Sequence, residues 1–402
     1  MSDYLKAVKI TEKVYWVGAI DWDIRNFHGY ATQRGTTYNA FLVLDEKVTL
    51  IDTVKAPFFS ELMARISSVI DPKKIDYIVS NHSEMDHSGS LPAAVQAIQP
   101  EKVFASPMGE KDLKGHFHDA LNLTVVKTGD KISLGSNNLS FVETKMLHWP
   151  DSMVSYLDGE KILFSQDAFG MHLAGTPLYA DEYPSYIIET EAKKYFANIL
   201  LLQAPKILDL LNQLPGLNLD IRLLAPDHGP LWRRDIGRIL ELYRQYALQE
   251  GKRKAVVIFD TMWHSTEKLA ASITDGIRQA GIEVEQICMA SSDRSAVMTR
   301  LMDAGLLVVG SPTMNNNVFP TVADVLTYMR GLKPQNLLGG AFGSFGWSGE
   351  APKQIAQELT NMGVEQPLAP LTVKYVPTGE DLARAFEFGN QLGGRLVARN
   401  NH

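Results

Sequence analysis

Cysteine is almost absent from this chain, because Cys288 is the single thiol among 402 residues. One thiol excludes an intrachain disulfide and a cysteine-ligated iron cluster within the chain. Cys288 ends an alternating run at 282–287 and is expected to be an ordinary strand residue.

Long apolar runs and excess positive charge are also missing. No run approaches the roughly 18 residues that a membrane-spanning helix needs. The 39 Lys and Arg residues and 46 Asp and Glu residues give a formal net charge of −7, which argues against a nucleic-acid partner. Residues 1–6 lack the basic-then-apolar layout of a signal peptide. We therefore expect a cytoplasmic protein that binds neither nucleic acid nor membrane.

The length predicts more than one domain. Helical patterns at 58–70, 108–116, 185–213 and 236–248 surround strand-like runs, with short antiparallel strands expected over 122–166. A charged, glycine-containing segment at 249–254 is typical of a linker. We predict a first domain at 1–250 and a second at 251–402.

The densest chemical motif is the hexapeptide His82-Ser83-Glu84-Met85-Asp86-His87. It follows a strand-like run at 75–81 and precedes a helical pattern, so it lies at the carboxyl end of a strand, where α/β folds collect ligands. In an extended chain, His82 and Glu84 would point one way, and Asp86 and His87 another. This favours two metal ions over one, and either over a merely polar loop.

Three later strand-like runs also end at metal-ligand residue types. They predict further ligands at His148, Asp167 and His228. His172, shortly after Asp167, could reach the entrance of such a site but is given no role.

The second half alternates strands and helices regularly, which is typical of a parallel sheet. Strands are expected at 255–260, 282–288, 306–310, 337–342 and 371–375. Such a domain binds its ligand at the loops after strands one, three and four. There is no G-x-x-x-x-G-K and no G-x-G-x-x-G motif, so neither a nucleoside triphosphate nor a dinucleotide is indicated. The hydroxyl groups of the first loop suit a monophosphate, unless they only cap the following helix.

The expected ligand-binding residues can be given loop by loop. They are Thr261, Met262, Trp263, His264, Ser265 and Thr266 after the first strand, Ser311, Pro312, Thr313, Asn315 and Asn316 after the third, and Ser344, Phe345, Gly346, Trp347, Ser348 and Gly349 after the fourth.

The pattern H-x-E-x-D-H, followed by His, Asp and His, resembles the flavodiiron proteins (A-type flavoproteins) over essentially the whole chain. The resemblance implies an α/β protein with a metallo-β-lactamase-like αββα sandwich and a flavodoxin-like, doubly wound parallel sheet that binds FMN. It also implies two irons. His82, Glu84, His148 and Asp167 would hold one, and Asp86, His87, His228 and a bridging Asp167 the other. Because neighbouring side chains tend to point apart, the sequence leaves open whether His87 or a water completes the second set.

The same resemblance implies a function. Dioxygen would be reduced to water, with electrons from a separate rubredoxin, in a head-to-tail homodimer. His28 would donate protons, the alternative being an ordinary surface-loop histidine. Tyr195 would donate a hydrogen bond near the irons, the alternative being a buried tyrosine whose hydroxyl bonds to a local partner. Nitric oxide reduction to nitrous oxide, a dinuclear zinc hydrolase and a simple electron carrier are the alternatives. Glu84 argues against the hydrolase, because a carboxylate in place of imidazole favours iron over zinc.

Overall fold

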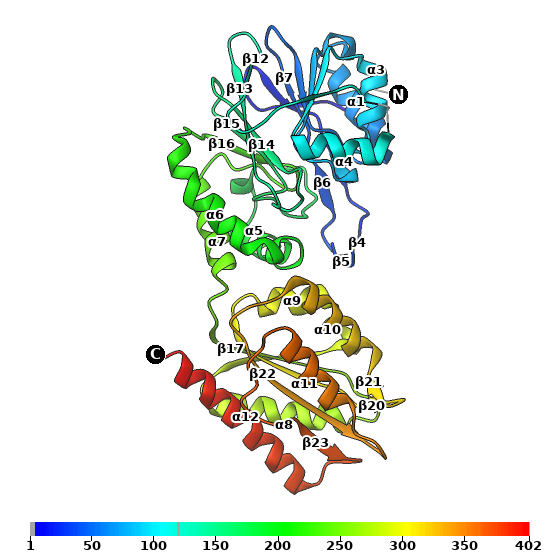
Figure 1. The fold of residues 1–402 in the computed structure, drawn as a ribbon, viewed down its shortest axis with the longest axis vertical. Coiled ribbons are helices and arrows are strands. Elements are labelled where there is room, and N and C mark those ends of the chain that lie inside the picture. Colours follow the sequence, from blue (N-terminus) through cyan, green and yellow to red (C-terminus); the bar gives the residue numbers. More distant parts are fainter. Residues whose placement is uncertain (1–4, 119–120, 402) are drawn as a thin grey trace. The chain divides into compact units, whose positions relative to one another are not determined.

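The computed structural model describes residues 5–118 and 121–401. The chain folds into two compact units (Figure 1). The first comprises Met1–His28, Thr32–Tyr195 and Pro205–Arg244, and the second comprises Gly29–Ala31, Phe196–Ala204 and Gln245–His402. The sequence did not indicate that two short segments of the N-terminal half group with the second unit. The domain boundary between residues 250 and 251 stays a prediction.

Two β-sheets form the centre of the first unit. The first sheet has the strand order β1 (Val8–Lys9), β2 (Val14–Trp16), β7 (Phe41–Val43), β8 (Thr49–Ile51), β9 (Tyr77–Ser80), β10 (Lys102–Ala105) and β11 (Leu123–Val125). The second has the order β12 (Lys131–Ser133), β13 (Asn138–Glu143), β14 (Met153–Leu157), β15 (Ile162–Gln166) and β16 (Leu223–Pro226). The expectation that 122–166 forms one antiparallel set is wrong for β11, which pairs parallel to β10 in the first sheet.

Alternation of side chains gives the first sheet two apolar faces. One face, with Leu50 and Ile78, packs on helices α1 (Phe59–Ser67), α3 (Leu91–Ile98) and α4 (Pro107–Phe117). The opposite face, with Ile51 and Val79, packs on second-sheet residues such as Phe164. This arrangement confirms the predicted sandwich.

The remaining elements of the N-terminal half are short strands and helices. The strands are β3 (Ala19–Asp21), β4 (Asn26–Phe27), β5 (Tyr30–Ala31) and β6 (Thr36–Tyr38), and the helices are α2 (Met85–Ser88), α5 (Ser185–Tyr195), α6 (Ala204–Gln213) and α7 (Ile236–Leu248). A π-helical turn at Phe196–Leu200 and a 3-10 turn at Leu201–Gln203 follow α5, so the helical pattern predicted over 185–213 is confirmed.

The second unit contains a parallel sheet with the order β18 (Glu283–Cys288), β17 (Lys252–Phe259), β19 (Ala304–Gly310), β22 (Leu338–Phe345) and β23 (Leu371–Lys374). Every residue of the central strand β19 is buried, as expected when both faces are covered. Its helices are α8 (Ser265–Gln279), α9 (Arg294–Leu301), α10 (Pro320–Leu332), α11 (Ala351–Asn361) and α12 (Gly379–Arg399). Helices α8 and α12 cover one face, and α9, α10 and α11 lie on the other (Figure 1). This is the predicted doubly wound fold.

Candidate metal centre and flavin site

The hexapeptide lies directly after β9, as predicted, but it is not extended throughout. Met85–Ser88 forms the helical turn α2, with Glu84 as its N-cap residue. On a helix, consecutive side chains differ by about 100° in direction rather than by the half-turn of a strand. The sequence assigns Asp86 and His87 to one side of the site although neighbouring side chains tend to point apart, and their ligand atoms do lie close together: Asp86 Oδ2 is 3.3 Å from His87 Nε2.

Three other loops bring ligands to the same place. His148 lies between β13 and β14, Asp167 follows β15 and His228 follows β16. The turn after His228 requires Gly229, which has a φ of +75° and whose added Cβ would lie 2.6 Å from Met171 O. Its N–H donates to Thr37 Oγ1 at 2.7 Å, which fixes the turn.

All seven predicted ligands fall into two groups of facing ligand atoms. In the first, His148 Nε2 lies 3.2 Å from Glu84 Oε2 and 2.8 Å from Asp167 Oδ2, and His82 Nε2 lies 3.3 Å from each of these oxygens. In the second, His87 Nε2 lies 3.1 Å from His228 Nε2, and His228 Nε2 lies 3.1 Å from Asp86 Oδ2.

Asp167 faces both groups. Its Oδ2 faces His82 and His148, whereas its Oδ1 lies 3.3 Å from His87 Nε2 and 3.4 Å from His228 Nε2. This is the placement that a bridging carboxylate requires.

Acceptors behind the imidazole rings were not identified from the sequence. Asp151 Oδ2 lies 3.2 Å from His82 Nδ1 and accepts from Ser83 N at 2.5 Å. Asp227 Oδ2 lies 3.6 Å from His87 Nδ1. His228 Nδ1 instead donates to a backbone carbonyl, Thr37 O, at 2.7 Å. Such partners orient histidine ligands and leave Nε2 for a metal. Asp227 directly precedes His228, which was a usable signal.

The buried charges perturb one another strongly. Burial favours the protonated form of Glu84, but hydrogen bonds from His148, His28 and His82 outweigh it and hold its pKa well below the ordinary value. Burial opposes charge on His148, yet Asp167 and Glu84 raise its pKa to about 9. Burial and the Asp52 charge raise the pKa of Asp227 well above its ordinary value.

The two residues expected to assist catalysis lie near the ligands. His28 Nε2 is 2.8 Å from Glu84 Oε1, and its side chain is 69 % exposed. The hydrogen bond to Glu84 raises its pKa. Tyr195 is buried, with its ring centroid 6.1 Å from that of His228, and burial raises its pKa well above the ordinary value.

An apolar groove of about 560 Å³ leads to Glu84 and Asp86. Phe27, Pro57 and Trp149 are among its lining residues. This groove is much larger than a diatomic molecule requires.

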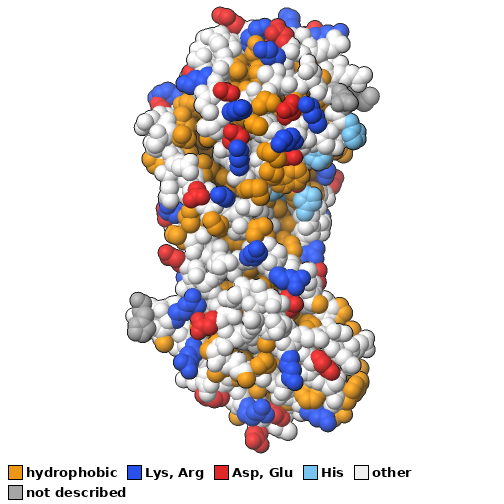
Figure 2. Space-filling view, in the orientation of Figure 1, with side chains coloured by type: hydrophobic (Ala, Val, Ile, Leu, Met, Phe, Trp, Pro, Cys, Tyr) orange, Lys and Arg blue, Asp and Glu red, His pale blue; other side chains and the backbone are white. Residues whose placement is uncertain are grey.

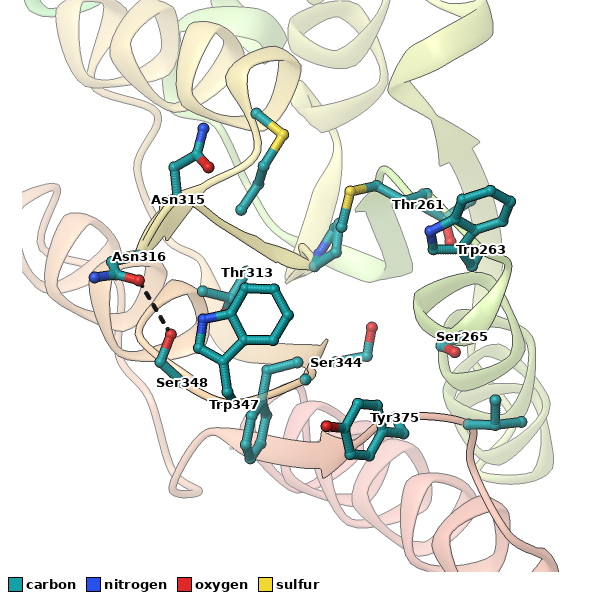
Figure 3. A pocket seen from close by; sticks show the side chains of 16 residues that line it. Thr261, Trp263, Ser265, Thr313, Asn315, Asn316, Ser344, Trp347, Ser348 and Tyr375 are labelled. Atoms are coloured by element: carbon teal, nitrogen blue, oxygen red, sulfur yellow. Dashed lines mark hydrogen bonds between the residues drawn. The ribbon is translucent and has the colours of Figure 1, made fainter.

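The loops after β17, β19 and β22 enclose a second cavity, of about 540 Å³ (Figure 3). The turn of β20 (Thr313–Met314) and β21 (Asn317–Val318) contributes Asn315 and Asn316, both with positive φ, and Asn316 Oδ1 accepts from Ser348 Oγ at 3.2 Å. The predicted residues that line the cavity are Thr261, Met262, Trp263, Ser265, Pro312, Thr313, Asn315, Asn316, Ser344, Phe345, Gly346, Trp347 and Ser348.

Four predicted residues do not line this cavity. The side chain of His264 pairs with Glu267, whereas Thr266 Oγ1 hydrogen-bonds to Ser344 Oγ, and Ser311 Oγ donates to Pro312 O. Gly349 is the fourth.

Three lining residues were not predicted from the sequence: Met314, Tyr375 and Val376. Tyr375 and Val376 follow the fifth strand of the same sheet, and this position was the available signal.

His264 occupies the N-cap position of α8, and its side chain makes no capping hydrogen bond in the described structure. The hydroxyl groups of the first loop therefore do not cap this helix. Thr261 Oγ1 is buried and has no hydrogen-bond partner among the described residues. These observations fit a phosphate group better than a purely structural turn.

Comparison with known proteins agrees with this architecture. Residues 36–229 match the model for the ODP family beta lactamase, and residues 257–389 match that for flavodoxin. The chain is 46 % identical to the rubredoxin-oxygen oxidoreductase of Megalodesulfovibrio gigas, covering 98 % of this chain and 99 % of that protein. It also matches the solved flavodiiron protein of Giardia intestinalis with a TM-score of 0.94 and 33 % identity, covering 99 % and 98 % of the two chains.

The chain belongs to the flavodiiron protein family. It is therefore an oxidoreductase with FMN and a non-haem diiron centre as its cofactors. A second relative, the nitric oxide reductase of Moorella thermoacetica, is 44 % identical over 97 % of this chain and 99 % of that protein.

Proposed function

We propose that this flavodiiron protein reduces dioxygen to water, with electrons that arrive through FMN from a separate rubredoxin. The observation that carries the proposal is that two buried groups of metal-type ligands face the two oxygens of Asp167, in a chain that also has a flavodoxin domain. The similarity to rubredoxin-oxygen oxidoreductase over nearly the whole chain supports this substrate and this donor.

In this proposal His82, Glu84, His148 and Asp167 hold one iron, and Asp86, His87, His228 and Asp167 hold the other. The donor set fits. The Nδ1–H of His228 is directed at Thr37 O, so its Nε2 lone pair faces His87 Nε2 at 3.1 Å, an arrangement that a cation between them stabilises. Three carboxylates and one bridging hydroxide would offset the charge of two ferrous ions in a buried site.

When bound, FMN would supply one-electron transfer, and the two irons would supply redox and Lewis-acid chemistry for a diatomic molecule. The protein would supply protons and exclude water. His28 is exposed at one side and bonded to Glu84 at the other, so it can carry protons from solvent to the site. Tyr195 keeps its hydroxyl proton, because its pKa is raised, and can donate a hydrogen bond. Phe27 and Trp149 keep the groove apolar.

Nitric oxide reduction to nitrous oxide is the second candidate, favoured by the 44 % identical relative that bears this activity in its name. The test is consumption of each gas by the iron- and FMN-loaded protein with reduced rubredoxin. Faster dioxygen consumption supports the first candidate, and faster nitric oxide consumption supports the second. A loaded protein that consumes neither gas contradicts both, and a preparation with zinc from iron-sufficient medium would favour a hydrolase.

We also propose a cytoplasmic, head-to-tail homodimer in which the FMN of one subunit serves the irons of the other. The apolar groove beside Glu84 has room for more than a gas, and its Met85 is 46 % exposed. Symmetric dimers are the commonest oligomers. None of the helices in the described residues has the length and apolar character needed to cross a bilayer.

Mixed dimers test this arrangement. A chain with Asp167→Asn keeps FMN but lacks a working metal centre. A chain with Thr261→Asp and Ser265→Asp repels the phosphate of FMN but keeps the irons. Mixing the two after reversible dissociation should restore activity if electrons cross between subunits. Dimers shown to be mixed but still inactive contradict the arrangement.

A further inference from the structure

Two histidines, His28 and His172, lie at the metal centre in addition to the four predicted histidine ligands. His172 is buried, and its ring centroid lies 4.7 Å from that of His228 and 5.0 Å from that of Tyr195. Unlike the four predicted histidine ligands, His172 belongs to neither group of facing ligand atoms. The hydrogen bonds around His172 explain how a histidine can lie next to a metal centre without being a ligand.

One hydroxyl connects His172 to a proposed iron ligand. Thr36 is fully buried in β6, and its Oγ1 lies 2.8 Å from His172 Nδ1 and 3.2 Å from His228 Nδ1. A hydroxyl group has a single proton to donate. The partners of Thr36 Oγ1, His172 Nδ1 and His228 Nδ1 therefore determine which of these atoms carries a proton toward which.

The direction of these hydrogen bonds follows from one fixed acceptor. Thr37 O can only accept, and it lies 2.7 Å from His228 Nδ1, so that nitrogen carries a proton. His228 Nδ1–H is then also a donor toward Thr36 Oγ1. The hydroxyl proton has two remaining acceptors, His172 Nδ1 at 2.8 Å and Thr37 O at 3.2 Å. The shorter contact, to an acceptor that His228 does not use, takes this proton.

We propose that Thr36 is a positioning residue that donates to His172 Nδ1 and thereby keeps His172 out of the metal coordination shell. With Nδ1 accepting a hydrogen bond, a neutral imidazole carries its proton on Nε2. Neither nitrogen of His172 then has a lone pair for a metal, whereas the same network leaves the His228 Nε2 lone pair directed at the cluster. In this arrangement His172 would not compete with a small substrate for the proposed metal site. This inference rests on the proposed diiron site.

The test compares Thr36→Val with Thr36→Ser. Valine has nearly the shape of threonine but lacks the hydroxyl, whereas serine retains it. The primary measurement is proton–nitrogen correlation NMR on the full chain, labelled with nitrogen-15 in histidine and loaded with zinc, which reports the protonated nitrogen of each ring without any catalytic turnover. A His172→Phe variant assigns the His172 signals.

We expect the His172 proton on Nε2 in the native chain and in Thr36→Ser, and a shift of this proton in Thr36→Val. In the iron-loaded protein, Thr36→Val should lower kcat about tenfold, a size usual for residues that orient metal ligands. Adding His172→Phe to Thr36→Val should recover part of that loss, because the competing ligand is gone.

A His172 proton on Nδ1 in the native chain overturns the inference, and so does a tautomer that Thr36→Val leaves unchanged. If Thr36→Val does not fold, the native and Thr36→Ser spectra still decide the tautomer. Failure of the native chain to bind a metal pair would instead contradict the proposed diiron site, so the two failures can be distinguished.

Discussion

The metal centre and the flavin cavity differ most in how far their side chains are exposed. No side chain of the seven proposed iron ligands is more than 15 % exposed, whereas Trp263 and Trp347 beside the flavin cavity are each 86 % exposed. The metal centre uses charged groups that are held by other charged groups. The flavin cavity uses loop backbone, hydroxyls and amides at the end of a parallel sheet (Figure 3).

This difference follows from the charge and polarity of each cofactor. Two metal ions can offset the desolvation free energy of three buried carboxylates, because the ions carry the opposite charge. A flavin ring has mainly apolar surface, so aromatic side chains that bind it can remain exposed to solvent in the flavin-free protein with only a small loss of free energy. We therefore expect the metal centre to respond sharply to single changes and the flavin site to respond gradually.

The largest effect should come from Asp167→Asn. An amide cannot supply a negative oxygen to both groups, so we expect loss of most iron and at least a roughly 100-fold fall in turnover, with FMN retained. Elemental analysis and flavin absorbance measure the two cofactors separately. Asp158→Asn, a change in the β14–β15 turn of the same domain, is the control. Normal iron content in Asp167→Asn would contradict the bridging role.

A somewhat smaller effect is expected for Glu84→His. The added imidazole removes a negative charge and should shift metal preference from iron toward zinc, because nitrogen ligands suit zinc. Metal content after growth with both metals, together with gas consumption, measures the change. Glu12→His, at an exposed position, should behave as the native protein. An active, iron-loaded Glu84→His protein would show that this carboxylate does not set the selectivity.

The flavin site should show a graded response in Trp347→Ala. Losing one stacked indole should weaken FMN binding about tenfold, equivalent to about 1.4 kcal/mol, with iron content unchanged. Fluorescence titration of the flavin-free protein gives the dissociation constant. Trp22→Ala, at a 52 % exposed tryptophan of the first unit, is the matched control. Equal effects of both changes would mean that Trp347 does not contact the flavin.

The smallest effect is expected on the free energy of unfolding of the metal-binding domain, at a residue that is not a metal ligand. The Asp45 side chain is 4 % exposed, and although burial opposes its charge, hydrogen bonds from Asn137 and Ser136 lower its pKa. A lowered folded-state pKa stabilises the fold above the unfolded-state pKa, and this contribution disappears as the pH falls. Asp45→Asn should cost about 2 kcal/mol near neutral pH.

Urea unfolding at neutral and acidic pH measures this contribution. The difference between the native protein and Asp45→Asn should shrink on acidification. Asp23→Asn, in an exposed loop, provides the control. A difference that does not depend on pH would mean that the carboxylate charge is not responsible.

The surface gives less guidance than either site. Lys and Arg side chains are interspersed with Asp and Glu on the face drawn in Figure 2, so that face offers no single block of charge from which to place a donor protein.

Local patterns were sufficient for much of the fold. The β-α alternation after residue 255 predicts the five parallel strands, and the observed strands differ from the prediction by a few residues at their ends. The helix at 236–248 begins and ends as its periodicity indicated. Such signals are readable because each depends on neighbours in the sequence.

The sequence by itself determined the two domain types and the seven proposed iron ligands, because residues of metal-ligand type directly follow strand-like runs in the sequence. Only the tertiary structure decided which residues stand behind those ligands. Asp151 and Asp227 come from two separate loops, Thr37 belongs to the short strand β6, and Thr36 meets His172 across 136 positions of the chain. Contacts of this range depend on how sheets pack, so no local pattern specifies them. The helical turn at Met85–Ser88 was also not predicted from the sequence, and it places Asp86 Oδ2 3.3 Å from His87 Nε2.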